Sequence, residues 1–195
     1  MGFDNLVIAE ITEDTVENFT TGPVQILAPA GEIKKSTETS SAVKHYDNQP
    51  YINITSEGAD SVEFITPVLP LDIEALIFGK EQDATTKILM DSGMPAVKYF
   101  AVGYRLLKTD GTYRYVWRNK GSFSKGDEEA KSKDDSTDTN NQTLTYTGIA
   151  TVHKFTKTNK PSKAMVADSF DDIIDYDKWF EDVVTPDNIS TLAAA

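Results

Sequence analysis

The sequence has 195 residues, the length of one sizeable domain with room for a hydrophobic core. Its 31 Asp and Glu residues outnumber its 19 Lys and Arg residues, and the formal net charge of -12 disfavours sequence-neutral binding to nucleic acid or anionic lipid. The absence of cysteine excludes disulfides, thiolate catalysis and cysteine-based zinc sites, and it fits a protein made in a reducing compartment.

The N-terminal segment MGFDNLVIAEITED carries acidic residues where a secretory signal carries basic ones, so we expect it to be mature sequence. No uninterrupted apolar run in the sequence approaches the roughly 20 residues of a membrane-spanning helix. We therefore expect a soluble protein with no membrane partner.

Alternating apolar and polar residues, rich in β-branched and aromatic types, predict a mostly β fold. The predicted strands cover residues 6–11, 51–55, 61–66, 98–107, 112–123 and 143–155. One stretch among them has helical spacing, because Ile73, Leu76 and Ile77 lie on one face. Pro70 precedes this stretch and Gly79 closes it, so we expect a short helix over residues 71–79.

The segment YFAVGYRLLKTDGTYRYVWRNKG is predicted to form a hairpin, because Asp110-Gly111 supplies the positive φ angles of a two-residue turn. Centring the turn there gives one face of the hairpin four large side chains: Tyr104, Leu106, Tyr115 and Trp117. The opposite face then carries Arg105, Arg114 and Arg118. We interpret the aromatic face as core. The arginine face is either solvated or meets an acidic partner.

A polar stretch runs from residue 119 to residue 142, and Ala130 is the only hydrophobic residue between residues 124 and 143. Such a stretch buries too little apolar area to offset its ordering entropy, so we expect a long mobile loop in the isolated subunit. Loops of this length are typically functional, and an inert surface insertion is the alternative. Its candidate contact residues are Lys125, Asp127, Glu128, Glu129, Lys131, Lys133, Asp134 and Asp135.

The C-terminal part of the sequence, residues 168–195, is expected to form an acidic segment outside a β-rich domain of residues 1–167. Residues 168–182 contain seven acidic residues and one lysine. Ser169 and Asp172 are spaced as a capping box, and the apolar residues after them follow a helical stripe, so we expect an amphipathic helix. A cation site on these aspartates is disfavoured, because EF-hand spacing and a loop glycine are missing.

The motifs of common enzyme classes are missing from the sequence. His45 and His153 are its only histidines, so it offers no histidine pair spaced for a metal or a general base. It contains no Gly-x-Ser-x-Gly elbow, Walker loop or Gly-x-Gly-x-x-Gly turn. Carboxylate pairs are too common here to be diagnostic of a hydrolase. We expect no cofactor, no metal and no enzymatic function.

The order of several motifs resembles the major tail protein of long-tailed phages that infect Gram-positive bacteria. These motifs are MGFDNLVIAEITED, the Thr21–Pro23 turn, STETSSAVKHYDNQP, LDIEALIFGK and KYFAVGYRLLKTDGTYRYVWRNKGSFS with a polar loop behind it. The resemblance covers most of the chain up to about Phe155. The acidic C-terminal segment and the closing Thr-Leu-Ala-Ala-Ala match less clearly.

The resemblance implies a tail tube subunit with a β-sandwich or open barrel and one short flanking helix. Such subunits assemble into stacked six-fold rings around a tape measure protein, end at tail terminator and tail tip proteins, and conduct DNA without binding it specifically. The location would be the virion, after synthesis in the cytoplasm of the bacterial host. The leading alternative is a virion-surface or extracellular β-sandwich module that binds cell-wall carbohydrate, which would need exposed aromatic residues in a shallow groove.

Two interfaces follow from the resemblance as expectations. The loop of residues 119–142 would become ordered only when a neighbouring ring supplies partners. The arginines Arg105, Arg114 and Arg118 would pair with carboxylates of an adjacent subunit, and the candidates are Asp171, Asp172 and Asp175. On this interpretation, replacing Arg118 with Glu blocks tube growth and leaves the monomer folded.

Overall fold

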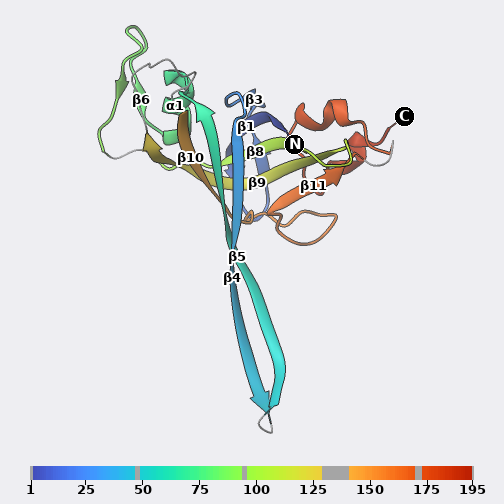
Figure 1. Ribbon diagram of the computed structural model, residues 1–195. Helices are drawn as coiled ribbons and strands as arrows, with labels where there is room; N and C mark the ends of the chain where they lie inside the picture. The colour runs from blue at the N-terminus through green and yellow to red at the C-terminus, as the bar shows by residue number, and fades with distance from the viewer. Residues whose placement is uncertain (1, 47–48, 94–95, 129–140, 170–172, 195) are drawn as a thin grey trace.

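The computed structural model describes residues 2–46, 49–93, 96–128, 141–169 and 173–194. The predicted mostly β fold with one short helix is confirmed: among these residues, nine strands form one large open antiparallel sheet, and two strands form a small one. The strands of the large sheet follow the order β2-β1-β8-β9-β10-β5-β4, with β3 also paired to β1 and β11 to β9 (Figure 1).

The bounds of the elements follow chain order. The strands are β1 Phe3–Asp14, β2 Phe19–Thr21, β3 Gln25–Ile26, β4 Glu32–Tyr46, β5 Gln49–Pro67, β6 Glu81–Gln82, β7 Leu89–Met90, β8 Phe100–Leu107, β9 Tyr113–Glu128, β10 Asn141–Gly148 and β11 Ala164–Asp168. The helix α1 is Leu71–Phe78, and two 3-10 helices follow as η1 Tyr176–Phe180 and η2 Ile189–Leu192. No helix of the described residues has the length and apolar character needed to cross a bilayer.

The helix α1 lies where the sequence predicts it. It ends at Gly79, which has a φ of 62° and a backbone N–H directed at the carbonyl oxygens of Ala75 and Leu76. A Cβ at Gly79 would stand 2.0 Å from the carbonyl oxygen of Ala96. Both the left-handed conformation and this close approach therefore require glycine.

The β8–β9 hairpin is confirmed, but its predicted register is wrong by one residue. Tyr104 pairs with Val116 and Gly103 with Trp117. The N–H of Lys108 donates to the carbonyl of Thr112 at 2.8 Å, so the turn holds three residues and ends in a bulge at Gly111, whose φ is 82°. A shift of one residue moves each side chain of one strand to the other face relative to its partner strand.

Both faces of the sheet consequently bury aromatic side chains. One face packs Tyr104 with Phe64, Phe100 and Tyr146, and α1 lies against it. The other face packs a second set, which comprises Ala9, Ala101, Tyr115, Trp117, Trp179, Val183, Val184 and Leu192. The interpretation of Tyr104, Tyr115 and Trp117 as core is confirmed, although they do not share one face as predicted.

The C-terminal segment covers the second face as a 3-10 turn where the sequence predicts an amphipathic α-helix. Asp175 caps η1 by accepting the N–H of Asp177, and Trp179 is buried inside the turn. The indole N–H of Trp117 donates to the carbonyl of Trp179 at 2.8 Å, which fixes the turn on the sheet. Asp171 and Asp172 lie outside the described residues.

Of the predicted mobile loop of residues 119–142, the structure describes residues 119–128 and 141–142, and these are strand. Residues 119–128 continue β9, and β10 already begins at Asn141. The pairing of Leu144 with Lys125 and of Gln142 with Glu128 satisfies the backbone of this polar stretch, so it needs little apolar burial to be ordered. The candidate residues Glu129, Lys131, Lys133, Asp134 and Asp135 lie outside the described residues.

The strands β4 and β5 form a long hairpin that leaves the sheet. The predicted strands 51–55 and 61–66 are one continuous strand, β5, and β4 was not predicted. Between Asp60 and Pro67, β5 also pairs with β10, but before Asp60 its only strand partner among the described residues is β4. We call residues 38–46 and 49–59 the arm. Figure 1 shows the arm projecting from the rest of the molecule as an isolated pair of strands.

Candidate assembly surface

The guanidinium of Arg105 lies against the first strand of its own chain. Its Nε and Nη2 donate to the two carboxylate oxygens of Asp4 at 2.5 and 3.0 Å. The ring of Tyr113 lies 4.3 Å from the guanidinium carbon. The hydrogen bonds to Asp4 raise the pKa of Arg105 above its ordinary value, so the guanidinium stays charged.

Arg114 pairs with the first residue of the predicted acidic segment. Its Nε and Nη2 donate to the carboxylate of Asp168 at 2.7 and 2.9 Å, and Lys108 Nζ lies 3.4 Å from the same carboxylate. Asp168 stands directly opposite Arg114 in the β9–β11 pairing. The hydrogen bond from Arg114 lowers the pKa of Asp168 from 3.8 to about 2. This bidentate pair lies within one chain and fixes the edge strand β11.

Arg118 is buried in a cluster of charges where the arm meets the sheet. Its Nη1 donates to Asp60, a carboxylate that is also buried. Asp60 accepts further hydrogen bonds at 2.8 Å from Lys163 Nζ and from the hydroxyl of Thr37. Burial raises the pKa of Asp60, but the bonds from Lys163 and Thr37 and the charges of Arg118 and Lys35 outweigh burial and hold it below 3.8.

The cluster around Asp60 corrects the expectation for Arg118. A guanidinium enclosed against Asp60 is committed to its own chain, so glutamate at this position would place two carboxylates together in the core. The Arg118→Glu variant would therefore destabilise the monomer, and it is no clean test of assembly. Contacts of Arg105 and Arg114 with a second copy stay a prediction.

The remaining predicted contact residues are only partly brought together. Asp175 pairs with Lys178 of its own turn at 3.0 Å, and Lys125 Nζ lies 3.7 Å from Glu74 on α1. Asp127 and Glu128 belong to β9. Within the described part of one chain, no arginine of the hairpin reaches Asp175, and pairing of these arginines with Asp175 of an adjacent subunit stays a prediction.

The arm is the largest feature that the sequence did not reveal. Its described side chains are mostly small, polar and exposed, and a hydrogen bond of 2.7 Å joins the hydroxyls of Ser40 and Ser56. Val43 and Ile52 are 49% and 41% exposed. An isolated two-stranded hairpin is marginally stable in water. A second surface would therefore stabilise the arm by covering it.

The large sheet also has open edges. In the body of the molecule, β4 is an edge strand, because among the described residues it pairs with β5 on one side and with no strand on the other. Lys34 and Lys35 belong to this strand. At the other end, in the part of the chain that the structure describes, β2 and β3 pair only with β1. Unpaired edges are templates for strand addition, and lysine on an edge strand restrains unwanted pairing.

The described residues contain no group of three or more histidines and carboxylates placed to hold a metal. A cavity of about 590 Å³ opens beside the β8–β9 turn, between Phe3, Ile33 and Leu106, and Phe3 is the only aromatic residue among those that line it. Tyr104, Tyr115 and Trp117 are buried, so these three form no exposed aromatic platform.

No protein-family model matches the chain, and no curated protein matches it significantly.

Proposed function

We propose that this chain is a structural, non-catalytic subunit of a phage tail tube that assembles with copies of itself into stacked six-fold rings. The observation that carries the proposal is the arm, two paired strands that leave the sheet without a core of their own. The order of motifs from MGFDNLVIAEITED to the Asp-Gly hairpin supports the same function by resemblance.

The arm would dock on the neighbouring ring. Its exposed Val43 and Ile52 give it apolar area to bury, and its many Ser and Thr residues can hydrogen-bond along another backbone. The base of the arm is held by Asp60, which binds Thr37 on β4 and Lys163 of the body. A fixed base reduces the conformational entropy lost when the arm docks.

The open edges of the sheet would close the ring. If the edge strand of one copy pairs with that of the next, the backbone groups left unpaired in the monomer are satisfied, and the edges no longer promote aggregation. The tape measure protein and later DNA would occupy the bore of this ring, and terminator and tip proteins would close the ends of the tube. The net charge of -12 supports passage of DNA without specific binding.

Electron microscopy of concentrated purified protein tests the proposal. We expect hollow tubes, or at least six-membered rings, in negatively stained fields. The carbohydrate alternative gains no support from the buried aromatic residues. Solitary particles that bind isolated cell walls would nevertheless replace the proposed function with that alternative.

A further inference from the structure

A basic segment of the chain has three lysines that play no part in the function argued so far. Residues 151–163 contain four lysines and no acidic residue, although the chain as a whole carries a net charge of -12. Lys154, Lys157 and Lys160 are exposed, and none of them forms an ion pair among the described residues. The fourth, Lys163, is bound to Asp60. We call residues 152–163 the lysine knob.

The backbone of the lysine knob is held by its own chain. The N–H of Phe155 donates to the carbonyl of Lys160 at 3.1 Å, and the ring of Phe155 is buried beside Phe19. The carboxylate of Asp187 accepts the N–H groups of Thr156 and Lys157 at 3.0 and 2.8 Å. The knob therefore presents its lysines on a preformed backbone, and little backbone order is lost when a partner binds.

Asp14 fastens the other end of the knob. Its carboxylate accepts the N–H of Val152 at 2.9 Å and the N–H of His153 at 3.0 Å. Lys120, which is largely buried, donates to the same carboxylate at 2.5 Å. A buried ion pair thus holds the start of the knob, while the three lysines themselves form no ion pair with any residue that the structure describes.

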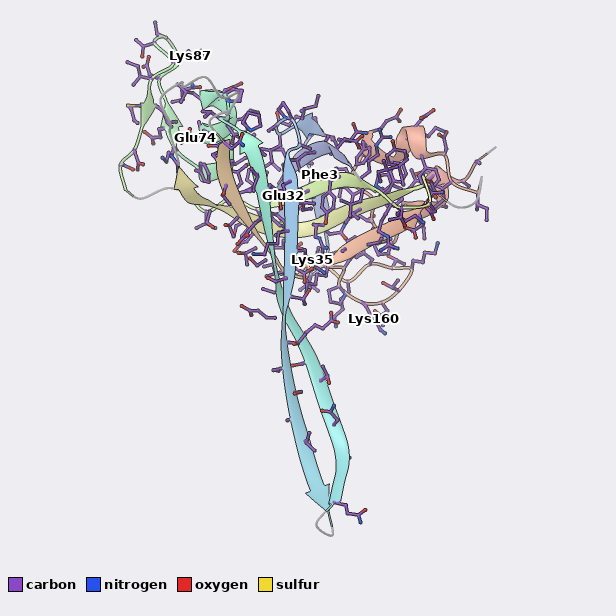
Figure 2. All side chains as sticks on the ribbon, viewed as in Figure 1. Phe3, Glu32, Lys35, Glu74, Lys87 and Lys160 are labelled. Atoms are coloured by element: carbon purple, nitrogen blue, oxygen red, sulfur yellow. The ribbon has the colours of Figure 1, made fainter. Side chains whose placement is uncertain are left out.

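The lysine knob lies beside the base of the arm. Lys163 Nζ donates to the carbonyl of Gly58 at 2.7 Å and to Asp60 at 2.8 Å, so it joins the knob to β5. Figure 2 shows Lys160 on the side of the body from which the arm projects, and Lys87 at the opposite end of the molecule. A partner that covers the arm at its base would meet the knob as well.

We propose that the lysine knob is a contact surface for carboxylates of a second copy of this chain. The inference rests on the proposed function, because it assigns the arm and the knob to the same partner. A second copy supplies the complementary charge, since each chain has 31 acidic residues against 19 basic ones. A polyanion such as DNA is the poorer partner, because three lysines neutralise few phosphates and the rest of the chain repels them.

Two variants with the same change of charge test the knob. Lys160→Glu alters the knob, and Lys87→Glu alters an exposed lysine far from it. The experiment measures the protein concentration at which half of the material sediments as assemblies. We expect Lys160→Glu to raise this concentration about tenfold, because like charges would then face each other, and Lys87→Glu to leave it within about twofold.

A third variant distinguishes weaker assembly from a folding defect. Lys154, Lys157 and Lys160 are replaced together by Gln, which removes charge without repulsion, and thermal unfolding of each variant is recorded. We expect unchanged unfolding, weaker assembly, and a smaller loss of assembly on raising salt from 50 to about 500 mM than for the unaltered chain. If the Lys160→Glu and Lys87→Glu variants assemble at the same concentration, the knob is not a contact surface. The proposed function is not affected by that result.

Two further outcomes are decisive. If the unaltered chain never assembles, both the proposed function and the partner of the knob are overturned. If fluorescence anisotropy detects duplex DNA bound through the three lysines while their replacement leaves assembly unchanged, the knob is a polyanion site, and the inference is wrong.

Discussion

At the scale of single residues, the ion pairs of this chain differ in how deeply they are buried. Asp60 and Arg118 are enclosed together, whereas Arg114 and Asp168 form a pair with partly exposed side chains. Removing one member of a buried pair leaves the other charge without compensation, while exposed pairs contribute little. The two aspartates therefore give a matched test.

Asp60→Asn is expected to lower the free energy of unfolding by about 3 kcal/mol, because Arg118 would lose its buried counter-charge. The matched change Asp168→Asn is expected to cost at most about 1 kcal/mol, since water solvates the charge that remains. Urea denaturation of both variants measures the difference. If both variants lose the same free energy of unfolding, the buried cluster at the base of the arm stabilises the fold no more than the exposed pair does.

The pKa of Asp168 gives a prediction for acid solution. Its pKa is about 2 in the folded chain and 3.8 ordinarily, so folding favours the carboxylate. The stabilisation by Asp168 is therefore complete above pH 3.8 and is lost as the pH falls from there through about 2. The difference in stability between the unaltered chain and Asp168→Asn should shrink across this window. A constant difference would contradict the assignment.

At the scale of elements, the sequence predicted most of the body and little of the arm. The strands β1, β8 and β9 and the helix α1 have clear apolar patterns, because each has at least one buried face. The strand β4 has no such pattern, since much of it is exposed to solvent. Its many Ser and Thr residues are a composition typical of loops. Apolar and polar residues alternate along a strand when one of its faces is buried. A strand that buries neither face in the monomer therefore shows no such alternation in its sequence.

Register and helix type were missed for local reasons. Asp110-Gly111 suits a two-residue turn and also the three-residue turn with a bulge that forms here, and the two differ by one residue in register. The apolar spacing after Ser169 fits an α-helix, but packing of Trp179 under Trp117 selects a 3-10 turn. The register of the hairpin and the type of helix are thus decided by contacts with residues that are distant in the sequence.

Removal of the arm tests its independence. Thr37 and Asp60 are opposite each other in the β4–β5 pairing, so an Asn-Gly turn can replace residues 38–59. We expect the shortened chain to unfold within a few degrees of the full chain, because the arm has few contacts with the body, and to lose assembly. Circular dichroism against temperature measures the first effect. A large drop in the midpoint would show that the arm supports the body.

At the scale of the whole molecule, the account holds that copies of this chain complete one another through the arm and the edges of the sheet. The described part of the monomer has a projecting hairpin, open sheet edges and a knob with three exposed lysines that form no ion pair there, and these surfaces are available to a partner. The motif order resembles a tail tube subunit, and such a subunit would use each of these features to contact another copy.

Sedimentation velocity over a wide range of concentration, on the full chain and on the chain without its arm, tests this claim most directly. We expect the full chain to shift from monomer to large assemblies as its concentration rises, while the shortened chain stays monomeric. A full chain that remains monomeric at every concentration and salt would contradict it, and so would assembly that is unchanged without the arm.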